Sequence, residues 1–257
     1  MRTWEEALKE HYEAVIAAGY ENKNILGIFA YGSQNYGVET ENSDWDTKAI
    51  IVPTWEDLVF QPPVSKEIHL VNGEHCEVKD IREIVKMFKK QNINFIEILY
   101  TEYKWVNLGF YELWEEYFVK ERERIAHYNT GKTVQSICGQ AIHTLKQNPT
   151  NGKKVANGYR LLRFLEEYLA GVNYKNCIVL SEKEREGIIK LKNSNSHIDS
   201  FINLTLAKTL ITRLEKLQYN TYEKNLEEMA TIDKVMETGI LEIIKVILPN
   251  PYNFELE

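Results

Sequence analysis

The spacing of apolar residues divides the chain into a first part with strands and a second part of helices. Residues 4–18 carry apolar side chains at helical spacing, and Gly19 follows them, as is common just after the end of a helix. Residues 25–31 form a short apolar run, and residues 44–52 alternate at first and then become apolar. Both of these stretches predict β-strands.

A second pair of strands is predicted on either side of a tight turn. Residues 66–71 and 75–79 flank Asn72 and Gly73, a residue pair that favours the two-residue turns of hairpins. Beyond this pair the apolar spacing becomes helical, and Asp80 is placed to cap the first helix. From there onward, strand-like alternation is largely lost.

The rest of the chain predicts helices separated by polar turns. Their approximate ranges are 108–118, 129–147, 153–170, 181–192, 198–217 and 223–248. Strands followed by a run of helices are typical of α+β proteins. We therefore expect an α+β fold, with a mixed sheet and its helices in a first domain at 1–107 and an all-helical domain at 108–257.

Composition indicates a folded protein without an excess of positive charge. The chain has 257 residues, of which 44% are hydrophobic, and 31 Lys and Arg against 38 Asp and Glu give a net charge of -7. This balance excludes a uniformly basic protein that coats nucleic acid. No apolar run approaches the roughly 20 residues of a membrane span, and the first residues lack the features of a secretory signal. The sequence therefore predicts a cytoplasmic protein with no membrane partner, and its widely spaced cysteines predict reduced, buried thiols.

Two acidic residues begin the second predicted strand. Asp44 and Asp46 alternate with Trp45, so strand geometry predicts that Asp44, Asp46 and Lys48 share one face. Neighbouring carboxylates repel each other unless cations lie between them, and Mg²⁺ or Mn²⁺ held by acidic oxygens is the common solution. Paired divalent ions of this kind catalyse phosphoryl transfer. A solvated strand end is the plainer explanation of these acids taken alone.

The turn after the first predicted strand suits a phosphate group. Gly32 allows a ligand to approach the backbone closely, and Ser33 adds a hydroxyl beside free N–H groups. By itself this pair also fits an ordinary tight turn. Together with the acids ten residues later, it predicts a site that grips a nucleotide triphosphate and holds metal ions at the phosphorus under attack.

These motifs carry a resemblance to a known family. Gly32-Ser33 followed by Ser43-Asp44-Trp45-Asp46 resembles the signature of the DNA polymerase beta nucleotidyltransferase superfamily. The form GSQNYGVETENSDWD is similar in particular to the predicted nucleotidyltransferases of the RNA repair pathway DNA polymerase beta family. Residues 153–171 resemble the helical region of that family, and Phe95 to Leu99 resemble the element after its sheet. The resemblance covers most of residues 27–171.

The resemblance implies a nucleotidyltransferase domain at 1–107 with three metal-binding carboxylates. Asp44 and Asp46 would be two of the ligands, and the third belongs on a later strand. Glu77, inside the predicted strand, is the first choice, although the superfamily more often has Asp at this place. Asp80, at the exit of the same strand, is the alternative and also fits a helix cap.

The resemblance also implies roles around the phosphates. Glu77 would help to take the proton from the attacking hydroxyl, while the Gly32 backbone, Ser33 and Lys48 would hold phosphate oxygens as pyrophosphate leaves. For Lys48, pairing with the acids of its own strand face is an equally good explanation.

A basic stretch favours an anionic partner. Residues 120–163 contain nine Lys and Arg and two Glu, a local net charge of +7. Candidate contacts to an RNA or tRNA acceptor are Lys153, Lys154 and Arg160, which we expect to lie at a distance from the Gly32-Ser33 turn. The alternative is a solvated face.

The leading hypothesis is an enzyme that transfers a nucleoside monophosphate from an NTP, with ATP the first candidate, to a hydroxyl acceptor. The acceptor would be RNA or a tRNA end, and two metal ions would assist the transfer. A second hypothesis is a protein adenylyltransferase of the antitoxin type. A third, from a different class, is a nucleotide-binding module without turnover.

Overall fold

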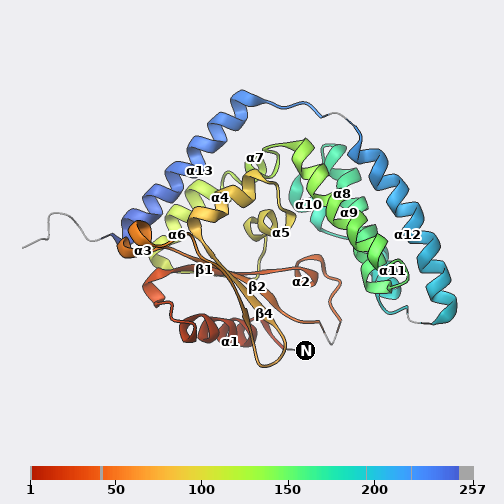
Figure 1. The fold of residues 1–257 in the computed structure, drawn as a ribbon, viewed down its shortest axis with the longest axis horizontal. Coiled ribbons are helices and arrows are strands. Elements are labelled where there is room, and N and C mark those ends of the chain that lie inside the picture. Colours follow the sequence, from red (N-terminus) through yellow and green to blue (C-terminus); the bar gives the residue numbers. More distant parts are fainter. Residues whose placement is uncertain (1, 41–42, 195, 221, 249–257) are drawn as a thin grey trace, which may run out of the picture.

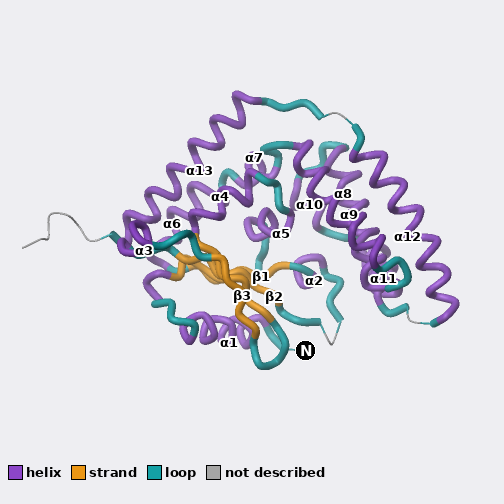
Figure 2. Tube along the Cα trace, in the orientation of Figure 1, coloured by secondary structure: helices purple, strands orange, loops and turns teal. Residues whose placement is uncertain are grey.

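The strands of the first part form one five-stranded sheet in the computed structural model, which describes residues 2–40, 43–194, 196–220 and 222–248 (Figure 1). They are β1 (Ile25–Tyr31), β2 (Asp46–Ile51), β3 (Ser65–His69), β4 (His75–Asp80) and β5 (Lys104–Val106). The order across the sheet is β3-β4-β2-β1-β5, with β2 and β4 parallel and the other pairs antiparallel. A mixed sheet followed by helices confirms the predicted α+β class (Figure 2).

The start of one strand and the presence of another differ most from the sequence prediction. The strand expected from Asp44 begins at Asp46, so Asp44 lies in the loop before β2. β5 has no counterpart in the prediction, because its three residues are too few to show a periodicity; β1 pairs with it. The hairpin between β3 and β4 is confirmed, and Gly73 adopts the left-handed conformation that its turn requires, with φ +90°.

The helices form where the sequence spacing predicts them, with additional short ones between. They are α1 (Trp4–Ala17), α2 (Ser33–Tyr36), α3 (Trp55–Phe60), α4 (Ile81–Lys89), α5 (Ile93–Ile96), α6 (Leu108–Trp114), α7 (Arg122–Ala126), α8 (Thr130–Gln147), α9 (Gly152–Leu169), α10 (Tyr174–Ile178), α11 (Glu182–Lys192), α12 (His197–Gln218) and α13 (Leu226–Ile247). Single turns occur at Asn22–Asn24 and Glu97–Leu99, and a π-helical turn at Glu115–Val119 continues α6. The short helices escape prediction because one or two turns show no periodicity.

Helices cover both faces of the sheet (Figure 1). α1 packs on one face, where Val15 joins a cluster with Ile28 and Val78 of the strands. The other face carries α4, α6 and, at the end of the chain, α13, which returns to contact α4 and α6. α8, α9, α11 and α12 pack against one another beside the sheet.

One hydrophobic cluster joins the sheet to the helices. It contains Phe29 of β1, Phe88 of α4, Leu161 of α9 and Ile243 of α13. The cluster therefore extends across the predicted boundary between 107 and 108. The sheet and the helical part share a core.

The start of α9 lies very close to the end of α11. A Cβ atom at Gly152 would stand 2.3 Å from the Leu191 carbonyl oxygen and 2.6 Å from Ser194 Oγ. Only glycine permits this approach, since real Cβ atoms do not come so near to backbone atoms. The contact brings Lys153 to the same side of the molecule as Lys192.

The cysteines and the hydropathy of the helices bear on the chain as a whole. Cys76, Cys138 and Cys177 are buried and free, as their spacing predicts. Within the same residues, no helix is both long and apolar enough to pass through a bilayer.

Candidate functional site

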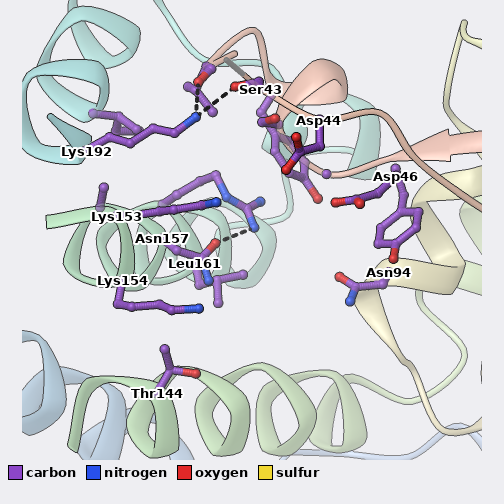
Figure 3. Close-up of a pocket in the computed structure, with 18 of the residues that line it drawn as sticks. Ser43, Asp44, Asp46, Asn94, Thr144, Lys153, Lys154, Asn157, Leu161 and Lys192 are labelled. Atoms are coloured by element: carbon purple, nitrogen blue, oxygen red, sulfur yellow. Dashed lines mark hydrogen bonds between the residues drawn. The ribbon is translucent and has the colours of Figure 1, made fainter. Parts of the chain in front are cut away.

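A pocket of about 330 Å³ lies between the sheet and helices α9 and α11 (Figure 3). The residues on the sheet side that bear on its chemistry are Tyr31, Gly32, Ser33, Asp44 and Asp46. Those on the helical side are Lys153, Lys154, Asn157, Arg160 and Lys192. The structure thus brings both predicted motifs together with the predicted basic residues. The expectation that the basic residues lie far from the Gly32-Ser33 turn is wrong, because Lys153, Lys154 and Arg160 of α9 line the same pocket as Gly32 and Ser33.

Two carboxylates face the pocket. Burial raises the pKa of the Asp46 carboxyl; the nearby His75 opposes this shift, and Asp44 adds to it by repulsion. His75 Nδ1 lies 2.9 Å from Asp46 Oδ1, and His75 Nε2 lies 3.0 Å from the Tyr31 hydroxyl. Asp44 is therefore close enough to Asp46 to destabilise its charge, which favours a cation beside these carboxylates.

Buried polar groups behind β2 fix the backbone between these two acids. The Trp45 N–H donates to Glu74 Oε1 at 2.9 Å. The other oxygen of Glu74 lies 3.1 Å from His11 Nε2 and also pairs with Arg2, and His11 Nδ1 lies 2.7 Å from Thr47 Oγ1. No sequence pattern links these residues, because they come from three separate segments that meet only in the fold.

Lys48 is buried beneath the pocket and does not line it. Its side chain is 2% exposed and forms an ion pair with Glu77 of the neighbouring strand. The ammonium lies over the rings of Tyr31 and Phe95, 4.0 and 4.1 Å from their centroids. Burial lowers the pKa of the Lys48 ammonium, and Glu77 opposes that shift. The structure supports pairing with an acid, not contact with phosphate, as the role of Lys48.

Neither candidate for a third metal-binding carboxylate reaches the pocket. Glu77 is held by Lys48 and by Lys79, whose Nζ lies 3.0 Å away. Asp80 caps α4 by accepting the Arg82 N–H at 2.8 Å and pairs with the Arg82 guanidinium. Within the ranges that the structure describes, no group of three or more acidic, histidine or cysteine side chains is arranged to hold a metal ion. The expected three-carboxylate set is therefore reduced to two.

The predicted turn at Gly32 and Ser33 is present, but its first N–H group is occupied. Gly32 has φ +88° and ends β1, and α2 begins at Ser33. The Gly32 N–H donates to Glu97 Oε1 at 2.7 Å, so it is not free for a phosphate oxygen. A Cβ at Gly32 would lie 3.9 Å from Asp46 Oδ2, which shows how closely the turn approaches the acids.

Through Tyr36, Glu97 connects this turn to Arg160 on the helical side of the pocket. It accepts hydrogen bonds from the Gly32 N–H and the Tyr36 hydroxyl, and the Arg160 guanidinium stacks on the Tyr36 ring, 3.7 Å from its centroid. Burial raises the pKa of the Glu97 carboxyl to about 8, and Arg160 opposes the shift. Burial lowers the pKa of Arg160 to about 10, and Glu97 opposes it. In the sequence, this buried group is indicated only by a single acid inside the otherwise apolar run Phe95 to Leu99.

Replacing Glu97 by Gln is expected to change how stability depends on pH. The folded chain keeps the Glu97 proton up to a pKa of about 8, whereas an unfolded glutamate loses it near 4.5. The stability that the protonated carboxyl contributes is therefore complete below the lower value and is lost as the pH rises through the higher one. Glu97→Gln has no proton to lose at this position, so its stability should not fall in this way. The Tm of the variant minus the Tm of the wild type should therefore be about 5 °C larger at pH 9 than at pH 5.

Calorimetric melting curves across this pH range measure the difference. Glu13→Gln, at an exposed position, is the control and should follow the wild type throughout. A difference between Glu97→Gln and the wild type that stays constant with pH would show that the carboxyl keeps its ordinary pKa.

Four of the nine basic residues in the predicted stretch are paired with acids and not directed at a ligand. The pairs are Lys120 with Glu116, Arg124 with Glu121 and Glu228, Lys146 with Glu215, and Arg163 with Glu167 and Glu184. In contrast, Lys153, Lys154 and Arg160 have no ion-pair partner among the described residues. Arg160 is buried and donates one hydrogen bond to Asn157 Oδ1, at 2.9 Å. Lys153, Lys154 and Arg160 thus bring positive charge without an ion-pair partner to the pocket.

Lys192 is a residue of the pocket that sequence reasoning missed. Its Nζ donates to the Val38 carbonyl and to Ser43 Oγ, each at 3.1 Å (Figure 3). Burial lowers the pKa of the Lys192 ammonium, Lys153 lowers it further, and Asp44 opposes the shift. Lys192 lies beyond the part of the chain that carries the resemblance, in a polar helix end that gives no signal of its own.

Figure 3 shows Lys153, Lys154 and Lys192 extending from the helices toward the side that carries Asp44 and Asp46. Carboxylates on one wall suit a divalent cation, and ammonium and guanidinium groups on the other suit phosphate oxygens. Gln34 and Asn35 of α2 line a second cavity of about 210 Å³.

Comparison with known proteins adds no assignment. No protein-family model matches this chain, and no curated protein shows significant similarity to it.

Proposed function

We propose that this chain transfers a nucleoside monophosphate from an NTP to a hydroxyl acceptor. The observation that carries the proposal is the opposition of Asp44 and Asp46 to the uncompensated cations of α9 and α11 across one pocket. A triphosphate with its divalent cation carries the complementary charges, because the cation seeks carboxylates and the phosphates seek ammonium and guanidinium groups.

The donor set fits Mg²⁺ or Mn²⁺. Mg²⁺ is commonly held by one or two carboxylates together with substrate phosphates, and Asp44 and Asp46 are two carboxylates beside a place for phosphates. When bound there, the ion supplies positive charge that offsets the charge of the phosphate oxygens. Burial raises the pKa of Asp46 and repulsion by Asp44 adds to the shift, and a cation bound beside both carboxylates would relieve that repulsion.

In this proposal the chain's own residues bind and orient the triphosphate. Lys153 and Lys192 neutralise phosphate oxygens and favour the departure of pyrophosphate. Arg160 is held in place by the Tyr36 ring and Asn157, so its planar fork is oriented before the substrate arrives. The Ser33 hydroxyl lines the same pocket and donates to a phosphate oxygen.

The acceptor hydroxyl is proposed to belong to RNA or a tRNA end, as the resemblance implies. The basic residues of the pocket do not select this acceptor, since they suit the triphosphate equally well. A protein hydroxyl is the acceptor to be tested beside it.

Incubation of the chain with each NTP, labelled at the α-phosphate, tests the proposal. With Mg²⁺ and total RNA we expect labelled RNA, and with EDTA we expect no product. Label on protein from a cell lysate, but not on RNA, would identify a protein acceptor. Calorimetry run in parallel should show NTP binding at least about tenfold tighter with Mg²⁺ than with EDTA. Binding without any transfer would indicate a nucleotide-binding module, and no binding would refute the proposal.

A further inference from the structure

The charges of Lys48 and Glu77 are arranged side by side in the sheet. β2 and β4 run parallel, and their register places Lys48 directly beside Glu77. Alternation along β2 puts Lys48 on the same face as Asp46, two residues earlier. Glu77 therefore lies on the same face of the sheet as Asp46. Its carboxylate nevertheless pairs with the Lys48 ammonium and does not line the pocket.

Turning Glu77 toward the pocket would leave a buried charge without a partner. The Lys48 side chain is 2% exposed, and aromatic rings of Tyr31 and Phe95 surround its ammonium. Among the residues described, Glu77 is the acid with which Lys48 forms an ion pair. Removing one partner of a buried ion pair is strongly unfavourable, because the other charge then lacks both water and a counter-charge. The pair holds Glu77 in place.

The remaining ligands are enough for one divalent ion but not for two. Mg²⁺ takes about six oxygen ligands in a regular octahedron. An ion that bridges the triphosphate and the two pocket carboxylates completes its shell with phosphate oxygens and water. A second ion beside it could share Asp44 or Asp46 but would need a further protein carboxylate, and Glu77, the candidate on the same face, is held by Lys48 and Lys79. Within the described residues, no group of three or more acidic, histidine or cysteine side chains is arranged to hold a metal ion.

We propose that the pocket holds a single divalent ion, bound by Asp44 and Asp46 together with the triphosphate, and that the Lys48 ammonium takes the place of a second ion in neutralising Glu77. This inference rests on the proposed nucleotide transfer, because the triphosphate completes the ligand shell. It differs from the paired-ion arrangement expected from the sequence. Lys48 acts through Glu77 and the sheet and touches no substrate.

Counting Mn²⁺ ions in the complex tests this inference. The chain is mixed with an equal concentration of a non-hydrolysable NTP analogue, Mn²⁺ is titrated in, and the free ion is measured by electron paramagnetic resonance. We expect one tightly bound Mn²⁺ per chain and no spin coupling between neighbouring ions. Two tightly bound ions per chain, or the spectrum of a coupled pair, would overturn the inference.

Two variants locate the ion. Glu77→Gln keeps an oxygen for the Lys48 ammonium, and we expect one bound Mn²⁺ with an affinity within about twofold of the wild type. Asp46→Asn is the matched comparison and should weaken Mn²⁺ binding at least tenfold. A tenfold loss in Glu77→Gln would show that Glu77 is a ligand and that the inference is wrong. Should the single variant fold poorly, Lys48→Met combined with Glu77→Gln removes both charges and should give the same count.

The outcome for nucleotide binding is separate. Calorimetry with the same analogue and Mg²⁺ shows whether the nucleotide binds at all. No binding refutes the proposed function and the single ion with it. Binding accompanied by two Mn²⁺ ions refutes only the single ion.

Discussion

Asn in place of Asp44 or Asp46 is expected to reduce transfer of label from an NTP by at least about 1000-fold. Each change removes a charge that the divalent ion requires and preserves the shape of the side chain. The Tm should hold or rise, because burial and repulsion by Asp44 already raise the pKa of Asp46 and so disfavour its charged form. Initial rates with labelled NTP and melting curves measure both effects.

The matched control for this loss is Glu13→Gln. It removes one negative charge at an exposed position of α1 and should leave transfer unchanged. Transfer at the wild-type rate in Asp44→Asn or Asp46→Asn would remove these residues from the mechanism.

Gln in place of both Lys153 and Lys192 is expected to weaken NTP binding by about 100-fold, since two charge-assisted contacts to phosphate oxygens are lost. Both side chains line the pocket, and each feels the charge of an acid on the opposite wall. This prediction depends on the shared pocket, whereas the sequence led us to expect the basic residues of α9 at a distance from the Gly32-Ser33 turn. Calorimetry with Mg²⁺ and an NTP measures the affinity.

Gln in place of both Lys120 and Lys146 provides the comparison. This variant loses the same charge, but both residues are exposed and paired with acids outside the pocket. We expect its NTP affinity to match the wild type within about twofold. Equal losses of NTP affinity in the two double variants would indicate a general effect of net charge. If the pocket variant loses RNA binding but keeps its NTP affinity, Lys153 and Lys192 contact the acceptor instead.

Local spacing predicts the strands and the candidate motifs because these features depend on residues near each other in the chain. β1 and the turn at Gly32 follow from an apolar run that ends in a small residue. Asp44 and Asp46 were found in the same way. Alternation along the strand correctly predicts that Lys48 shares a face with Asp46, but it does not reveal the partner of Lys48 on the neighbouring strand.

The features that escaped prediction depend on segments that meet only in the folded chain. The parallel pairing of β2 with β4 sets Lys48 against Glu77, and no local pattern reveals this register. Lys192 reaches the pocket because α11 packs on α9, a contact that depends on Gly152. Glu74 accepts a hydrogen bond from the Trp45 backbone N–H, and a contact to the backbone leaves no pattern of side chains in the sequence.

The hydrophobic cluster shared by Phe29, Leu161 and Ile243 makes both walls of the pocket parts of one solid body. Moving the walls apart as separate units would expose apolar surface to water, at a cost of about 25 cal/mol per Å². We therefore expect the nucleotide to diffuse into a preformed site without waiting for a hinge to open. Electrostatic steering by the lysines should govern its association rate, which should fall as salt screens their charge. Little binding free energy should be lost to ordering the protein.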